Sequence, residues 1–205
     1  MMKLKLRGTD IFISFTLVCV CAICIITGMF ANFLCSLLAI LFHESGHLFW
    51  LCKFGCPPDE IKISLFEIKI NDVSRHTRGV SQNFLIIFFG PFVNFICFIL
   101  FYLLYLKYNL FYPLAAANLC VGLFNSLPVI SLDGGQLIYL FLTLRFTPEA
   151  AEKCVNIITF IFIFPLAALG FLVLFNSKYN FSLLFVCVYL IFSLAFKNNG
   201  YFDGG

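Results

Sequence analysis

The sequence predicts an all-α polytopic membrane protein, with about six transmembrane helices and a small membrane-associated β-hairpin after the second helix. Hydrophobic residues make up 62% of the 205 residues and charged residues only 11%, which excludes an ordinary water-soluble domain. Several apolar runs reach the length of about 20 residues that a membrane-spanning helix needs. One long polar stretch, residues 53–83, interrupts them. We expect residues 1–205 to form a single membrane domain.

The apolar run from Ile11 to Leu51 is too long for one span, so we divide it near Gly28. The other long runs are each about one span in length. The predicted spans are residues 11–27, 33–52, 84–106, 111–127, 154–175 and 180–196. The apolar residues 137–144 are too few to span and predict a helix at the membrane boundary.

The polar stretch contains the predicted hairpin. Apolar and polar residues alternate from Ile61 through Ile63 to Leu65, as they do in a half-buried strand. The alternation slips at Phe66 and resumes over residues 67–70. A turn or bulge at the slip joins two strands in this interpretation.

Basic residues predict the orientation in the membrane. With six spans, eleven of the 13 Lys and Arg residues fall on one side, and only Lys107 and Lys178 fall on the other. The positive-inside rule then makes both termini and the 53–83 loop cytoplasmic. The net charge of +3 gives no indication of nucleic-acid binding. We expect no cleavable signal peptide, because the apolar run after the basic start is too long and lacks a cleavage site.

The most specific motif is the pentad His43-Glu44-Ser45-Gly46-His47, near the C-terminal end of the second predicted span. Residues four apart share one helix face, so His43 and His47 can direct ring nitrogens at one metal ion. Glu44 lies beside that point, where a general base is needed. Gly46 leaves room for another backbone or a substrate. The alternative is a polar packing cluster, against which the cost of ionisable groups in lipid argues.

Two histidines leave a catalytic zinc site one protein ligand short, because such sites use three protein ligands plus water. Asp133 is the natural third ligand, since the fourth span ends on the same side of the membrane as the pentad. The two glycines after it would let the backbone turn sharply. The alternative is an ordinary Asp-Gly-Gly turn. Two asparagines lie in apolar runs, and we expect Asn125 to contact substrate and Asn94 to bridge helices.

At these residues the chain resembles the site-2 protease family of intramembrane zinc metalloproteases. The matching segments are H-E-S-G-H at 43–47, G-P-F-V-N at 90–94 and N-S-L-P-V-I-S-L-D-G-G at 125–135. The last is similar to the family's Asn-Pro-Asp-Gly element, with Asn125, Pro128, Asp133 and Gly134 as its members. The resemblance extends from the first predicted span to at least Gln136.

The resemblance implies hydrolysis of a peptide bond in or beside the bilayer. One zinc ion would be held by His43, His47 and Asp133, with Glu44 as the general base. The substrate helix must be unwound, and we expect the hairpin to add a substrate strand at its edge. Further substrate contacts are expected at Asn125, Pro128, Gly134, Ile61, Ile63 and Leu65.

Within the family, the chain is most similar to the stage IV sporulation protease type, in its basic start, six spans and short loop after the pentad. The loop is too short for a PDZ domain, and we expect no nucleotide-binding CBS domain of the kind that well-known members carry. The resemblance implies a bacterial membrane location, as in the outer forespore membrane. It implies the membrane-associated pro-sequence of a sporulation sigma factor as substrate, and membrane-protein inhibitors as further partners.

Three alternatives stay open. The enzyme could act more broadly, on anti-sigma factors or signal-peptide remnants. A membrane metal transporter would also place His and carboxylate groups in spans, but it predicts ligands repeated along a path rather than at one depth. An inactive relative acting as a scaffold has no need of the intact Glu44.

Overall fold

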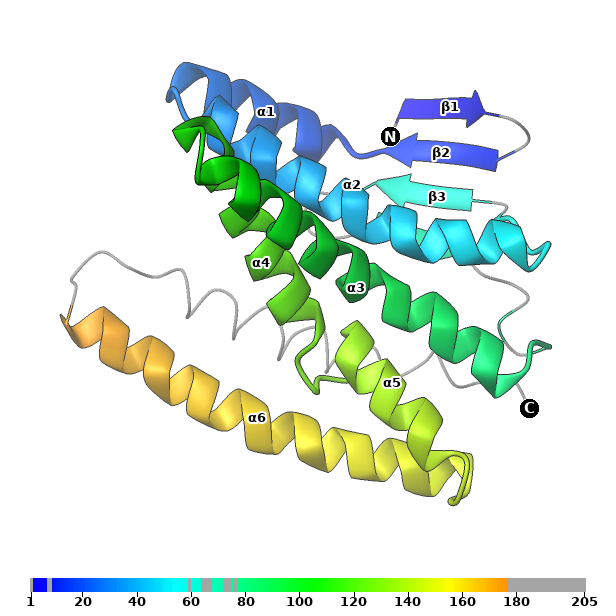
Figure 1. Ribbon diagram of the computed structural model, residues 1–205. Helices are drawn as coiled ribbons and strands as arrows, with labels where there is room; N and C mark the ends of the chain where they lie inside the picture. Colours follow the sequence, from blue (N-terminus) through cyan, green and yellow to red (C-terminus); the bar gives the residue numbers. More distant parts are fainter. Residues whose placement is uncertain are drawn as a thin grey trace. The chain divides into compact units, whose positions relative to one another are not determined.

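The computed structural model describes residues 2–6, 9–58, 60–63, 68–71, 75 and 77–176. The predicted sixth span, residues 180–196, and the predicted substrate residue Leu65 lie outside the described residues. The chain divides into two compact units, residues 1–123 and 124–205, and each unit is described by itself. Figure 1 shows the order of the helices and strands along the chain.

The first unit contains a four-stranded sheet, with the strands in the order β1-β2-β3-β4. Its strands are β1 (Met2–Leu6), β2 (Thr9–Ile13), β3 (Glu60–Ile63) and β4 (Ile68–Asn71). β1 pairs with β2 and β3 pairs with β4 in antiparallel register, whereas β2 and β3 are parallel. Only the two strands of residues 61–70 were predicted from the sequence. The pairing of β2 with β3 joins segments about fifty residues apart, which no local pattern indicates.

The first predicted span, residues 11–27, is not confirmed. Residues up to Ile13 belong to β2, and α1 (Phe15–Ile26) has 12 residues, which is about 18 Å of helix. A straight helix of that length is shorter than the hydrocarbon core of about 30 Å. An apolar run does not distinguish a strand from a helix, and here the hydrogen bonds to β1 and β3 decide the conformation of its first residues.

Three described helices are long and apolar enough to cross a membrane, by length and composition: Phe30–Lys53, Val80–Tyr105 and Pro148–Leu169. The first two are α2 and α3, and they correspond to the second and third predicted spans. α4 (Tyr112–Asn125) has 14 residues, or about 21 Å, which is shorter than the predicted span at 111–127. The six predicted spans are therefore not confirmed.

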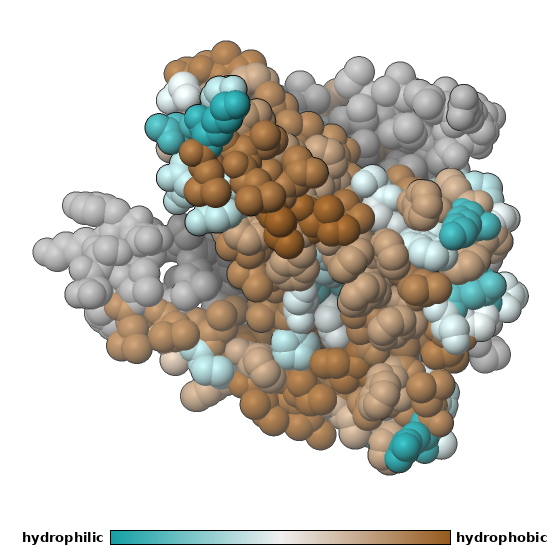
Figure 2. Space-filling model, viewed as in Figure 1, coloured by the Kyte–Doolittle hydropathy of each residue, from teal (hydrophilic) through white to brown (hydrophobic). Residues whose placement is uncertain are grey.

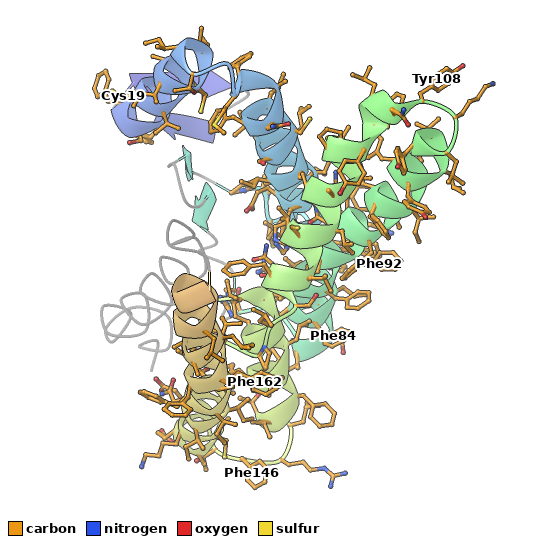
Figure 3. All side chains as sticks on the ribbon, turned by 90° about the vertical axis from the view of Figure 1, so that its left-hand side faces the viewer. Cys19, Phe84, Phe92, Tyr108, Phe146 and Phe162 are labelled. Atoms are coloured by element: carbon orange, nitrogen blue, oxygen red, sulfur yellow. The ribbon has the colours of Figure 1, made fainter. Side chains whose placement is uncertain are left out.

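α2 and α3 pack along each other in the first unit, and Figure 1 shows them side by side. A short 3₁₀ turn, η2 (Asn109–Phe111), follows α3 and leads into α4. The apolar faces that α3 does not use for packing stay exposed. Phe84, Phe88 and Phe92 form a stacked ladder along it, with ring centroids 5.9 and 5.3 Å apart, and the labelled Phe84 and Phe92 project from the same side of the helix (Figure 3).

The second unit is built on α5 (Asp133–Leu142) and α6 (Pro148–Asn176). The segment before α5 folds against α6 through a small core of Val129, Leu132 and Ile163. α5 begins at Asp133, so the two glycines lie in the first turn of a helix rather than in the sharp turn that the sequence analysis expected. The Asp side chain at a helix start is favoured by the helix dipole.

Hydrophobic residues dominate the exposed surface of the described residues. Figure 2 shows brown, hydrophobic side chains over most of the visible face, with hydrophilic residues confined to small patches. Leu103 and Phe160 are more than 60% exposed, as are many other large apolar residues on the long helices. A water-soluble protein rarely exposes apolar patches of this extent, and a lipid environment explains them.

Candidate metal centre

His43 and His47 come together on the face of α2 that packs against α3. Their Nε2 atoms are 3.2 Å apart, and their rings meet edge to face with centroids 4.8 Å apart. His43 is buried, with 4% of its surface exposed. The i, i+4 spacing of the pentad predicted this convergence, and both residues do lie on one helix, α2.

The other ring nitrogen of each histidine contacts a hydrogen-bond acceptor. His47 Nδ1 lies 2.8 Å from the main-chain oxygen of Ile86, and His43 Nδ1 lies 2.8 Å from Oδ1 of Asn94. A carbonyl oxygen can only accept a hydrogen bond, so the Nδ1 atom of His47 carries the proton. The same follows for His43 once the orientation of the Asn94 amide is known.

Asn94 is held in one orientation by its own amide group. Its Nδ2 donates to the main-chain oxygen of Ala39 at 2.9 Å and to Oδ1 of Asn118 at 3.1 Å. Because the Ala39 oxygen cannot donate, Nδ2 must face it, and Oδ1 must face His43. Asn94 therefore bridges α2, α3 and α4, which confirms the helix-bridging role predicted from the sequence. Its contact with His43 was not predicted, although G-P-F-V-N places it on the same face as Gly90, four residues earlier.

These contacts leave both Nε2 atoms with a lone pair, 3.2 Å apart, and two such acceptors cannot hydrogen-bond to each other. A zinc ion with Zn–N bonds of about 2.05 Å and tetrahedral angles separates two nitrogen ligands by about 3.3 Å. The histidine pair therefore fits a zinc ion. Ligating histidines almost always give their second N–H to a carbonyl or carboxylate, as both do here.

Two glycines allow α2 and α3 to approach at this point. A Cβ atom on Gly46 would lie 2.3 Å from the main-chain oxygen of Phe89, so the prediction that another backbone comes close to Gly46 is confirmed. A Cβ atom on Gly90 would lie 2.3 Å from Cε1 and 2.4 Å from Nε2 of His47. A side chain at either position would displace the helices or the ring.

Glu44 follows His43 in α2 and is half-buried. One residue along an α-helix is a rotation of about 100°, so Glu44 leaves the helix beside the two histidines and not between them. That placement suits a carboxylate that acts on water near the histidine pair and does not itself bind the metal.

The remaining predicted residues of the second motif lie in the second unit. Asp133 is the first residue of α5, and Asn125 is the last residue of α4; both are half-buried. A Cβ atom on Gly134 would lie 2.3 Å from the main-chain oxygen of Ser126. Gly134 is buried against this turn, where it has a packing role, and its contact with substrate stays a prediction.

Pro128 lies in the turn that leads to α5, and a threonine of α6 holds this turn. Thr159 is fully buried; its Oγ1 accepts a hydrogen bond from the amide of Ile130 at 3.0 Å. The same hydroxyl donates to the main-chain oxygen of Pro128 at 3.4 Å. The main chain of Pro128 is thus held by α6, and no local sequence pattern predicts this contact.

The predicted substrate contacts Ile61 and Ile63 lie in β3, which is a central strand. Ile61 is paired with Ile11 of β2 on one side and with Ile70 of β4 on the other. The main chain of β3 is therefore unavailable to a substrate strand, which corrects the predicted role of these two residues. Among the described strands, the edges of the sheet are β1 and β4.

Two comparisons with known proteins found a similarity, one to part of the sequence and one to the fold. A model of peptidase family M50 matches residues 107–166. The structure is similar to the site-2 protease from Methanocaldococcus jannaschii, with a TM-score of 0.71, 20% sequence identity and coverage of 100% of this chain and 98% of that chain. The fold is that of a site-2 protease. No curated protein matches the sequence.

The family match and the pentad are separate observations. The M50 model covers Asn125, Pro128 and Asp133 but not His43 or His47. The site-2 protease fold covers the whole chain. The family match thus concerns the second half of the motif set alone, whereas the fold similarity includes both halves.

Proposed function

We propose that the protein is an intramembrane zinc metalloprotease that cleaves a membrane-associated protein near the cytoplasmic face. The observation that carries the proposal is the convergence of two histidine Nε2 atoms, 3.2 Å apart on rings whose Nδ1 atoms face acceptors, on a helix long and apolar enough to cross a membrane. The M50 match and the site-2 protease fold support the same reaction class.

His43, His47 and Asp133 are the proposed ligands. Two imidazoles and a carboxylate are a donor set that can hold a metal ion, and zinc is the metal that such a set binds in hydrolytic enzymes. When bound, zinc supplies a Lewis acid and lowers the pKa of water. Asn94 and the Ile86 carbonyl keep the two rings in the tautomer that ligation needs.

Glu44 is the proposed general base. In this mechanism its carboxylate takes a proton from the attacking water and later delivers that proton to the leaving amine, so that one group serves both half-reactions. The half-buried position of Glu44 in an apolar helix limits the number of competing water molecules. Asn125 is the proposed hydrogen-bond partner of the substrate main chain, since it ends α4 a few residues before Asp133.

The proposed substrate is a transmembrane or membrane-associated protein whose cleaved segment is extended. Strand addition at β4 would unwind the segment, because an edge strand offers main-chain hydrogen bonds that a helix cannot use. Because main-chain hydrogen bonds carry such pairing, we expect low selectivity for the side chains of the substrate. The narrower proposal, based on resemblance in the sequence motifs, is a pro-sigma factor in a sporulating bacterium, with membrane-protein inhibitors as regulators.

The transporter and scaffold alternatives make different predictions. A transporter needs metal movement across the bilayer and does not need Glu44 as a base. A scaffold binds its partner without cleaving it. Neither has an observation of its own in the described residues that favours it.

Cleavage of a co-expressed tagged membrane substrate, comparing wild type with Glu44→Gln, tests the proposal. We expect the variant to keep about one zinc ion per chain and to lose cleavage by several orders of magnitude, because the base is removed and the ligands are intact. Full cleavage by a zinc-loaded Glu44→Gln protein would overturn the mechanism. Zinc content of Asp133→Ala separately tests the third ligand: retained zinc would exclude Asp133.

A further inference from the structure

A chain of two buried asparagine amides connects α4 to the candidate metal ligand His43. It begins at Asn118, whose Nδ2 donates to the main-chain oxygen of Leu114 at 2.8 Å. Its Oδ1 accepts from Nδ2 of Asn94 at 3.1 Å, and Oδ1 of Asn94 faces Nδ1 of His43 at 2.8 Å. Asn94 and Asn118 each have 0% of their surface exposed.

The direction of every hydrogen bond in this chain is fixed at its ends. The Leu114 oxygen can only accept, so the Asn118 amide points its Nδ2 toward it and its Oδ1 toward Asn94. The Ala39 oxygen imposes the same constraint on Asn94. Two main-chain carbonyls therefore determine, through two amides, that Nδ1 of His43 carries the proton.

The reverse orientation of the Asn94 amide would have a defined consequence. Its Nδ2 would then face His43, and Nδ1 would accept a hydrogen bond, so that Nε2 would carry the proton. That tautomer has no lone pair on Nε2 for a metal ion. Asn118 disfavours the reversal, because its own oxygen would then meet the Asn94 oxygen at two side chains with no exposed surface.

We propose that Asn118 is a positioning residue, which acts through Asn94 to hold His43 in the Nδ1-protonated tautomer that binds metal. The proposal rests on the proposed metal site but not on protease activity. It assigns a function to a residue outside the three motif segments, on a helix that carries none of the proposed ligands.

Three variants of α4 test this role. Asn118→Leu removes the acceptor for Asn94 and keeps a side chain that branches at Cγ. Asn118→Asp restores it, since a carboxylic acid that is neutral in this buried place accepts from Asn94 and donates to Leu114. Leu114→Ala, one turn earlier, perturbs the packing of α4 and leaves its own main-chain oxygen in place.

Two measurements on the detergent-purified full chain decide the outcome. Zinc affinity by chelator competition is expected to fall about tenfold in Asn118→Leu, at the low end of the range for groups that orient metal ligands. It should recover in Asn118→Asp and stay within about twofold of wild type in Leu114→Ala. In metal-free, ¹⁵N-histidine-labelled protein, His43 is expected to be Nδ1-protonated in wild type and a mixture of tautomers in Asn118→Leu.

An Asn118→Leu protein with unchanged affinity and tautomer would overturn the proposal. Equal losses in Asn118→Leu and Leu114→Ala would also overturn it, because they would assign the effect to packing. If wild type bound no zinc, the proposed function would fail, while the tautomer of the metal-free protein would still decide the role of Asn118.

Discussion

Asn94 is the residue on which the geometry of His43 depends most directly. It is fully buried and accepts the ring N–H of His43 while donating to two other helices. A buried group that serves three elements is costly to replace, because each lost partner leaves an unsatisfied donor or acceptor.

We predict that Asn94→Leu lowers zinc affinity by about 10- to 100-fold, as is typical when the hydrogen-bond partner of a ligating histidine is removed. Asn83→Leu is the matched control, since Asn83 is also a buried asparagine on α3 but bonds to the Arg75 oxygen and to Arg78. Chelator competition measures both. Equal affinities in the two variants would contradict the role of Asn94.

Gly90 is a second residue that the centre requires. We predict that Gly90→Ala loses zinc and destabilises the fold by about 1–3 kcal/mol, because its Cβ would overlap the His47 ring. Gly79→Ala is the control at the residue that precedes the same helix, since a Cβ there meets nothing within 4 Å. Metal content and thermal unfolding in detergent check both. Normal zinc content in Gly90→Ala would show that the helices separate without disturbing the rings.

At the scale of elements, α6 fixes the turn that precedes α5 through Thr159. We predict that Thr159→Val destabilises the protein by about 1–2 kcal/mol, because the amide of Ile130 and the oxygen of Pro128 lose a buried partner. Thr143→Val is the control, since the Thr143 hydroxyl donates to the main-chain oxygen of Leu140 in its own turn. We expect the unfolding temperature of Thr159→Val to lie several degrees below that of Thr143→Val. Equal unfolding temperatures would contradict a stabilising role for the Thr159 hydrogen bonds.

The sheet makes a prediction about where substrate binds. Lys62 in the central strand β3 and Lys69 in the edge strand β4 are register partners. A photo-crosslinking amino acid at position 69, in a Glu44→Gln background, should capture a tagged substrate more efficiently than one at position 62, because β4 is an edge strand with an open side whereas β3 is paired on both sides. Stronger capture at position 62 would place the substrate elsewhere.

At the scale of the whole molecule, the membrane determines which surfaces are exposed. α3 has 26 residues, or about 39 Å, enough to cross the bilayer once. The residues before Val80 and the turn at Lys107 should therefore lie on opposite sides. Reporter fusions after residues 79 and 108 test this: we expect a cytoplasmic reporter to be active at 79 and an external one at 108. The same reporter active at both positions would exclude α3 as a span.

The sequence by itself determined the membrane class, the helix that carries His43 and His47, and the convergence of the two rings. These features depend on local periodicity: an apolar run long enough to span, and a spacing of four residues on a 3.6-residue helix. The family match over residues 107–166 and the shared fold are in keeping with the motifs read from the sequence.

Tertiary structure decided the rest, because it depends on contacts between distant segments. The pairing of β2 with β3 made a strand of residues that an apolar run assigned to a helix, and it placed Ile61 in the centre of a sheet. The contact of Asn94 with Asn118 and His43 joins three helices. No local pattern encodes which ring nitrogen meets an acceptor, so the tautomers of the two histidines follow only from how α2, α3 and α4 pack together.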